Sequence, residues 1–388
     1  MNNSTLKSQR PHIAFFGCTN VGKSSLVNAI TNQNISIVSD IKGTTTDAVS
    51  KSMEILPLGP VVIIDTAGLD DKSELGNLRI EKTKQILDKT DIAILVIDAT
   101  SGENNFDKEL IEIFKKKNIP YLIVHNKSDL IKTQEAETIY TSTLTGYGIS
   151  ELKEKIGKIL ENKKEEKFII RDRINAKDII ILVTPIDESA PKGRLILPQQ
   201  LVLREILDAH ATAICTQPEE LENLLKTITP KFIITDSQVF NKVKTIVPQE
   251  IVLTSFSILM ANFKGELQTL LNGAEKLSNL KDGDKILISE GCTHHRQCND
   301  IGTVKMPKWI TDFSGKNLDF QFTQGGEFPQ DLSKYALIVH CGGCMLNEVE
   351  MKSRLNKANE QNVSIINYGM AIAHMNGILE RSMEIFKG

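Results

Sequence analysis

The sequence predicts an α/β protein with three consecutive domains, each built on an open sheet. The chain of 388 residues is too long for one hydrophobic core. Short apolar runs alternate with polar, helix-like stretches along most of its length. A highly charged stretch at residues 161–173 interrupts this alternation and marks the clearest boundary. We therefore expect domains at residues 1–166, 167–262 and 263–388, the second and third smaller than the first.

The first domain contains apolar runs that are typical of buried parallel strands. These runs lie at residues 12–16, 61–65, 92–98 and 121–125. A helix is expected over residues 25–30, directly after a glycine-rich loop. This order of strand, loop and helix is the framework of an open α/β sheet.

The second and third domains repeat the alternation without a glycine-rich loop of this kind. Strands are expected at residues 178–183, 212–216, 232–236 and 251–253, with helices at 199–210, 219–228 and 240–246. A helix over residues 267–280 then leads to strands at 285–289 and 336–340. Open α/β sheets bind ligands beyond the carboxyl ends of their strands, so the residues after positions 289 and 340 are candidate ligand-binding residues.

Composition excludes several classes of protein. A net charge of −3 gives no electrostatic reason to expect nucleic acid or a membrane surface as a partner. The polar N-terminal residues lack a secretory signal, and no apolar run has membrane-spanning length, so we expect a cytoplasmic protein. Four of the six cysteines gather near histidines in the last hundred residues, which favours metal ligation over disulfides.

The glycine-rich loop is a phosphate-binding loop in its proper context between a strand and a helix. Its backbone N–H groups can surround phosphates, Lys23 can reach the β and γ oxygens, and Ser24 can ligate magnesium. The residues that we expect to contact the nucleotide here are Gly17, Asn20, Gly22, Lys23, Ser24 and Ser25.

Three further motifs complete a guanine-nucleotide site. Asp65 and Gly68, in Asp-Thr-Ala-Gly, can approach the magnesium water shell and the γ-phosphate. In Asn126-Lys127-Ser-Asp129, the Asp129 carboxylate can accept hydrogen bonds from N1 and N2 of guanine, whereas adenine offers the wrong donors. Thr141 and Ser142 lie where a backbone N–H would meet guanine O6. The first domain is therefore expected to be a P-loop GTPase domain that binds GTP with Mg²⁺.

Residues 11–160 resemble the translation-factor-related GTPases, especially the potassium-activated tRNA-modification branch. Leu69 stands where ordinary small GTPases have a catalytic glutamine, while Asn20 and the segment Ser39-Asp-Ile-Lys-Gly-Thr44-Thr45 match that branch. The resemblance implies that Thr45 ligates magnesium. It also implies that Asn20, Thr44 and the carbonyls of Ser39 and Ile41 hold K⁺, which replaces an arginine finger. The catalytic residues expected on this basis are Asn20, Lys23, Thr45 and Gly68.

Two short segments supply soft metal ligands in the third domain. Cys292-X-His294 and His340-Cys341-X-X-Cys344 offer three thiolates and two imidazoles. A Cys-X-X-Cys turn after a strand directs two sulfurs at one metal, and Gly342 and Gly343 permit a tight backbone there. On residue chemistry alone, an iron–sulfur cluster and tetrahedral zinc are equally compatible with this set.

The cysteine spacing below an N-terminal GTPase resembles the scaffold GTPases of [FeFe]-hydrogenase maturation, the HydF family, over essentially the whole chain. The resemblance implies a dimerisation domain, a homodimer and a [4Fe–4S] cluster on Cys292, Cys341 and Cys344. The fourth iron site would be open to His294, His340, a carboxylate, water or the cargo, while Cys298 lies outside the motif. It also implies a diiron precursor received from radical-SAM maturases and delivered to the [FeFe]-hydrogenase apoprotein.

The competing interpretation is a zinc-stabilised, potassium-activated GTPase of tRNA modification or ribosome assembly. The tRNA-modification family embeds its GTPase within a helical domain, whereas here the GTPase motifs come first. A ribosome-binding protein is expected to carry a basic face or an RNA-binding Gly-X-X-Gly domain, and neither is evident. The sequence therefore favours the maturation scaffold.

Overall fold

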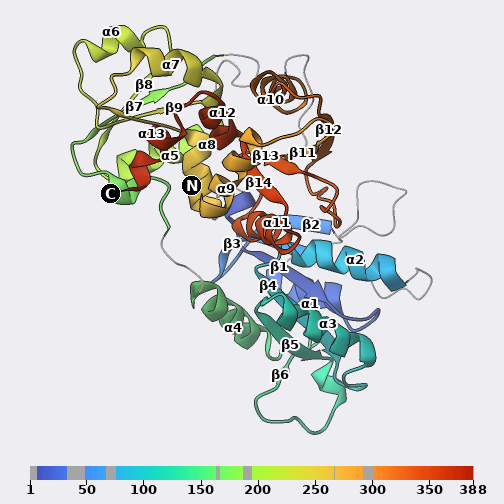
Figure 1. Cartoon of the computed structure of the whole chain (residues 1–388). Helices are drawn as coiled ribbons and strands as arrows, with labels where there is room; N and C mark the ends of the chain where they lie inside the picture. The colour runs from blue at the N-terminus through green and yellow to red at the C-terminus, as the bar shows by residue number, and fades with distance from the viewer. Residues whose placement is uncertain are drawn as a thin grey trace. The chain divides into compact units, whose positions relative to one another are not determined.

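The chain divides into two compact units, Met1–Glu165 and Glu166–Gly388, in a computed structural model (Figure 1). The structure describes residues 7–32, 49–66, 76–162, 167–186, 195–265, 267–291 and 300–387. Within these residues, no helix is both long enough and apolar enough to cross a membrane.

The first unit is built on a six-stranded mixed sheet with the order β2-β3-β1-β4-β5-β6. All neighbours pair in parallel except β2 and β3, which pair antiparallel. The strands are β1 (His12–Phe16), β2 (Val49–Ile55), β3 (Gly59–Asp65), β4 (Ile92–Asp98), β5 (Tyr121–Asn126) and β6 (Ile139–Tyr140). The helices are α1 (Lys23–Thr31), α2 (Gly76–Leu87), α3 (Asn105–Lys116) and α4 (Ile149–Asn162).

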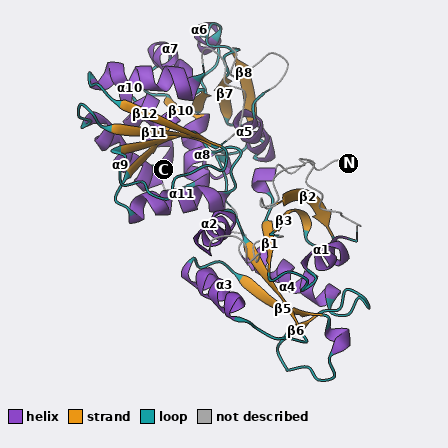
Figure 2. Ribbon diagram, turned by 90° about the vertical axis from the view of Figure 1, so that its right-hand side faces the viewer, coloured by secondary structure: helices purple, strands orange, loops and turns teal. Residues whose placement is uncertain are grey.

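Helices cover both faces of this sheet, so its strands are apolar on both sides (Figure 2). Along β1, Ile13 and Phe15 pack into the core shared with α1 and α4, while Ala14 and Phe16 pack into the opposite core with α3. This alternation follows from the two-residue period of a strand. The prediction of a parallel α/β sheet is confirmed, and the strands at residues 12–16 and 92–98 have the predicted bounds.

The second unit contains two four-stranded sheets, and every strand pair in them is parallel. The first has the order β10-β9-β7-β8 and the second β12-β11-β13-β14. The first sheet comprises β7 (Ile179–Val183), β8 (Thr212–Thr216), β9 (Phe232–Thr235) and β10 (Val252–Ser255), with α5 (Leu197–Asp208), α6 (Leu221–Leu225) and α7 (Phe240–Ile246). The second comprises β11 (Lys285–Glu290), β12 (Asp319–Gln324), β13 (Leu337–His340) and β14 (Ser364–Asn367). The remaining helices are α8 (Phe256–Lys264), α9 (Leu267–Ser278), α10 (Met306–Ser314), α11 (Glu348–Glu360), α12 (Tyr368–Met375) and α13 (Leu379–Met383), of which α13 packs on β10 of the first sheet.

The two sheets of this unit share one continuous hydrophobic core. It joins Ile181 and Ile233 of the first sheet to Leu287 and Ile338 of the second. Helix α8 is buried on most of its surface and contributes to the packing of both sheets. The predicted boundary between residues 262 and 263 falls inside this helix, so the second and third domains form one packed body.

Candidate functional sites

The phosphate loop joins β1 to α1 through backbone geometry that only glycine accepts at two positions. Gly17 has φ +135°, and a Cβ there would lie 2.2 Å from the Val96 carbonyl oxygen. Gly22, at the N-cap of α1, has φ +91°, and its Cβ would lie 2.3 Å from Asn126 Nδ2. The loop is thus seated against β4 and the Asn126 side chain, with the helix N-terminus facing the phosphate position.

The side chain of Lys23 is held by hydrogen bonds to the backbone of the phosphate loop. Its Nζ donates to the carbonyl oxygens of Gly17 at 2.6 Å and Cys18 at 2.7 Å, and the residue is only 7% exposed. These contacts place an ammonium inside the curve of the loop, where the phosphate oxygens of a nucleotide would lie.

The magnesium side of the site joins residues from two elements. Ser24 at the start of α1 donates from Oγ to Asp65 Oδ2 at 3.2 Å, at the carboxyl end of β3. Asn20 is exposed and has φ +65°, and Ser25 is also exposed. The remaining predicted residues here, Ser39, Ile41, Thr44, Thr45, Gly68 and Leu69, lie outside the described residues.

The predicted base-binding residues come together at the ends of β5 and β6. Asn126 is 1% exposed; its Nδ2 donates to the Val21 carbonyl at 3.0 Å, and its Oδ1 accepts from Thr141 Oγ1 at 3.3 Å. Ser142 Oγ donates to Asp129 Oδ1 at 2.5 Å. Asn126 therefore braces the phosphate loop against the base-binding loops, while Asp129 is oriented by Ser142.

Lys127 has a partner that the motifs did not reveal. Its Nζ forms an ion pair of 2.6 Å with Asp98 Oδ2, at the end of the adjacent strand β4. The side chain is thereby fixed beside the base-binding position, although its own φ of +63° is left-handed. The sequence feature that could have predicted this ion pair is Asp98, an acidic residue at the end of the apolar strand β4, which lies next to β5.

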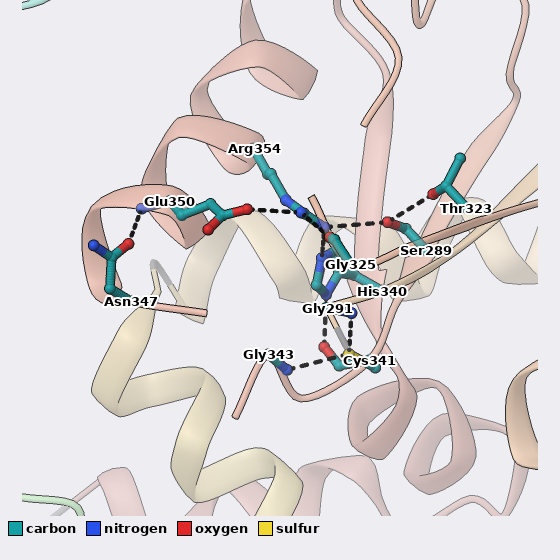
Figure 3. Close-up of polar contacts among 10 residues, drawn as sticks. All are labelled: Ser289, Gly291, Thr323, Gly325, His340, Cys341, Gly343, Asn347, Glu350 and Arg354. Carbon is teal, nitrogen blue, oxygen red and sulfur yellow. Dashed lines mark hydrogen bonds and ion pairs between the residues drawn. The ribbon is translucent and has the colours of Figure 1, made fainter. Parts of the chain in front are cut away.

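Cys341 begins the turn that follows β13, and the backbone holds its sulfur. Figure 3 shows the Gly291 and Gly343 N–H groups directed at Cys341 Sγ, at 3.0 and 3.4 Å. The Cys341 N–H also donates to the Ser289 carbonyl at 2.9 Å, which extends the pairing with β11. Gly343 has φ +61°, so the turn between the two cysteines depends on a left-handed residue.

Both thiols of this turn favour the protonated state in the metal-free protein. Burial raises the pKa of Cys341 to about 11, against the opposing hydrogen bonds from Gly291 and Gly343. Burial also raises the pKa of Cys344, against the opposing charge of Lys264. Metal ligation requires thiolates, so binding at this turn would release protons.

His340 is fully buried, and both of its ring nitrogens are engaged. Nδ1 lies 2.7 Å from the Cys341 carbonyl oxygen, and Nε2 lies 3.0 Å from Arg354 Nη1. A guanidinium only donates, so Nε2 accepts and the proton is on Nδ1. Burial, reinforced by the charge of Arg354, lowers the pKa of His340 to about 3. In this arrangement the ring has no free lone pair, so the predicted role of His340 as a ligand would require it to leave Arg354.

Arg354 of α11 is the centre of the polar network behind the cysteine turn (Figure 3). Its Nη2 donates to the Gly325 carbonyl at 2.6 Å and to Glu350 Oε1 at 2.9 Å. Its Nη1 lies 3.4 Å from Ser289 Oγ, which accepts from Thr323. The guanidinium thereby ties three strands of the second sheet to one helix.

Lys264, the last residue of α8, contacts the cysteine turn from the other side. Its Nζ donates to the carbonyls of Gly343, Cys344 and Leu346 at 2.9, 3.0 and 2.7 Å. Burial lowers the pKa of Lys264 to about 8, against the opposing effects of Cys344, Cys341, Glu348 and Glu350. The sequence feature that points to this contact is a lysine at the end of a mostly apolar helix.

The remaining predicted soft ligands cannot be placed beside this turn. Cys292, His294 and Cys298 lie outside the described residues. In the part of the chain that the structure describes, no three His, Cys, Asp or Glu side chains gather as a metal site. Neither Cys341 nor Cys344 forms a disulfide. Both lie in one turn beyond the carboxyl end of β13, the end of an open α/β sheet at which ligands usually bind.

Three regions of the chain match known family models. Residues 12–127 match the model of a 50S ribosome-binding GTPase. Residues 169–265 match the hydrogen maturase F dimerization domain, and residues 268–385 match the hydrogen maturase F tetramerization domain. The chain belongs to the hydrogen maturase F family. This maturase carries a P-loop GTPase domain, so the predicted hydrogenase-maturation GTPase is confirmed at the level of the family.

Curated relatives match the maturase over part of its length. GTPase Der from Kosmotoga olearia is 35% identical over 171 residues, which cover 38% of this chain and 38% of the relative. The tRNA modification GTPase MnmE from Endomicrobium trichonymphae is 35% identical over 175 residues, covering 42% of this chain and 38% of the relative. The matched part thus spans about two-fifths of these relatives. The crystal structure of the G domain of the T. maritima FeoB iron transporter is 27% identical with a TM-score of 0.32, covering 39% of this chain and 99% of that one.

Proposed function

We propose that this maturase is a GTP-hydrolysing scaffold that binds a [4Fe–4S] cluster and carries the diiron precursor of the hydrogenase cofactor. It would receive the precursor from radical-SAM maturases and deliver it to the [FeFe]-hydrogenase apoprotein in the cytoplasm. The observation that carries the proposal is the cysteine turn after β13, in a chain matched by both maturase models.

The donor set fits an iron–sulfur cluster. Cys341 Sγ receives two backbone N–H groups, and such contacts stabilise a thiolate that binds a cluster. Cys341 and Cys344 would supply two thiolates, with Cys292 as the third and His294 or His340 among the candidates for the fourth position. Three fixed thiolates leave one iron of the cluster open, and this open iron would supply the point at which the precursor binds and leaves.

The first unit would provide slow, potassium-stimulated GTP hydrolysis. Lys23 is held at the phosphate position, and Ser24 and Asp65 lie together on the magnesium side. Asn20 would bind K⁺ together with Thr44, and Thr45 would complete the magnesium ligands. Hydrolysis rates in KCl and NaCl test this, and an Asn20→Ala variant should lose the difference between the two salts while keeping GTP affinity.

A homodimer is the expected assembly, in keeping with the matched dimerization domain. The two edges of the first four-stranded sheet differ: β10 is covered by α13, whose Arg381 donates to the carbonyls of Pro248 and Ile251. Among the described residues, no strand pairs with the outer edge of β8. We propose that β8 forms the subunit contact. Light scattering that gives the mass of a single chain would exclude the dimer.

The proposal that the chain binds an iron–sulfur cluster is tested by measuring the metal content of protein isolated without oxygen. About four iron and four sulfide per chain, with a paramagnetic signal on reduction, are expected for one [4Fe–4S] cluster. Cys341→Ser and Cys344→Ser should lose them, whereas Cys215→Ser, at an exposed thiol on β8, should not. Stoichiometric zinc without sulfide would instead support the zinc-stabilised GTPase.

A further inference from the structure

Lys264 is a buried ammonium whose partners are all uncharged. It is 3% exposed, and its three hydrogen bonds go to the carbonyls of Gly343, Cys344 and Leu346. An ammonium has three N–H groups, so these carbonyls use all of them and leave none for a carboxylate. The positive charge is therefore placed against the cysteine turn without a hydrogen-bonded counter-ion.

Such an arrangement is unfavourable unless negative charge is present nearby. The groups that interact electrostatically with Lys264 are Cys344, Cys341, Glu348 and Glu350, of which Cys344 has the largest effect. Cys341 and Cys344 would add negative charge beside Lys264 as thiolates that ligate a metal.

We propose that Lys264 positions the cysteine turn and balances the negative charge of the metal group that the turn binds. The proposal rests on the proposed function, because it takes Cys341 and Cys344 to be metal ligands. The three carbonyl contacts fix the turn in the conformation in which the Gly343 N–H reaches Cys341 Sγ. The ammonium then favours thiolates over thiols and, for a cluster, the reduced state over the oxidised state.

The contact also joins two parts of the chain. Lys264 lies in the region matched by the dimerization model, whereas its three acceptors lie in the region matched by the tetramerization model. Helix α8 is fixed at its other end as well, because Ser255 caps it at the end of β10. Ser257, in its first turn, accepts from the Gly369 N–H in α12, the helix that follows β14. The cysteine turn is therefore anchored to a helix that continues directly from a strand of the first four-stranded sheet.

The test measures metal binding and cluster potential in the full chain. The variants are Lys264→Met, which removes the charge and the donors, and Lys264→Gln, which removes the charge but keeps two donors. Lys264→Arg keeps the charge. The matched control is Lys244→Met, since Lys244 also donates to a backbone carbonyl, that of Asn376, outside the cysteine turn.

Anaerobic titration with Co²⁺ alone, followed by thiolate-to-cobalt absorption, gives the affinity of the turn. Lys264→Met is expected to weaken Co²⁺ binding by about tenfold or more, the loss typical of a partner that orients metal ligands. After reconstitution with iron and sulfide, Lys264→Met and Lys264→Gln should both shift the reduction potential of the cluster to more negative values. Lys264→Arg should restore most of the potential, and Lys244→Met should match the wild type.

Each failure has a distinct meaning. A wild-type chain that binds neither Co²⁺ through thiolates nor iron with sulfide would overturn the proposed function and this inference with it. A wild-type chain that binds both, with Lys264→Gln unchanged in potential, would overturn only the charge-balancing role. A Lys264→Met chain with wild-type Co²⁺ affinity would overturn the positioning role. If Lys264→Met does not fold, both the Co²⁺ affinity and the reduction potential are measured on Lys264→Gln instead.

Discussion

Replacing Arg354 by methionine should destabilise the second unit strongly, even in metal-free protein. The Arg354 side chain is 4% exposed and that of its partner Glu350 is 16% exposed, so the pair is shielded from water. Methionine fills much of the same space but donates no hydrogen bonds. The variant therefore leaves the Glu350 carboxylate, the Gly325 carbonyl and His340 Nε2 without the donor that each has in the wild type.

The magnitude follows from the burial of these groups. Removing one partner of a buried ion pair costs about 3–5 kcal/mol, because the other charge is left uncompensated. The partial exposure of Glu350 places the expected loss near the lower limit, about 3 kcal/mol. For a unit of this size, such a loss lowers the melting temperature by about 6–12 °C.

The single tryptophan of the chain allows this unit to be observed alone. Trp309 lies in α10 and packs against the core of the second unit. Urea unfolding followed by tryptophan fluorescence therefore reports on the unit that contains Arg354. Arg204→Met is the matched control, because Arg204 and Asp208 form an exposed pair on α5 whose loss should cost less than about 0.5 kcal/mol.

A double variant separates the ion pair from the rest of the network. Arg354→Met combined with Glu350→Gln should lose less free energy of unfolding than the two single variants together, since no charge is left buried alone. A loss below about 1 kcal/mol for Arg354→Met would refute the interpretation of Arg354 as the centre of a buried network.

Three further predictions concern the two sites. Gly17→Ala should abolish nucleotide binding, because its Cβ would lie 2.2 Å from the Val96 carbonyl at φ +135°; fluorescence of a labelled GTP measures this, and Gly326→Ala, in open space and without a positive φ, is the control. Asp129→Asn should lose guanine affinity and gain affinity for xanthosine triphosphate, because an amide N–H can donate to the added O2; unchanged GTP affinity in competition assays would argue against the base assignment. His340 has its pKa lowered from 6.5 to about 3, so it favours the folded state above pH 6.5, and this contribution should fall by about 1.4 kcal/mol per pH unit as pH decreases towards 3. Urea unfolding at several pH values should show that component in the wild type and lack it in His340→Gln; equal slopes would contradict the buried neutral ring.

Continuous apolar runs made much of the fold predictable. The apolar strands at residues 12–16 and 92–98 have the predicted bounds. The strand at 212–216 and the helix at 240–246 also have the predicted bounds, although neither is a continuous apolar run. Four strands were missed: β2 and β12 lack such runs, β6 is only two residues long, and β14 is a short buried parallel strand that begins at the polar Ser364. β2 alternates polar and apolar residues because it pairs antiparallel at a sheet edge, and β12 is a partly exposed edge strand. A search for buried parallel strands does not detect this pattern.

The sequence motifs supplied the predicted ligands of each site, whereas the side chains that hold the cysteine turn in place were not predicted. Lys264 lies 79 residues from the first carbonyl that it contacts, and Arg354 lies 29 residues from Gly325. Residues this far apart in the sequence form no short motif, so neither contact could be predicted from the sequence. Only the packing of α8 and α11 against the second sheet brings these side chains to the cysteine turn.

The same packing holds the cysteine turn in place through contacts within the protein itself. The core of the second unit is formed by strands and helices on both sides of the turn, and the turn itself is fixed by Lys264 and by N–H groups directed at Cys341. In a small zinc domain the metal supplies the folding energy, so the ligands have no arrangement without it. Here buried apolar side chains stabilise the strands and helices on both sides of the turn, so the proposed metal would not be the main source of folding energy. The proposed carrier role would need this independence, because the cargo would have to bind and leave while the protein remains folded.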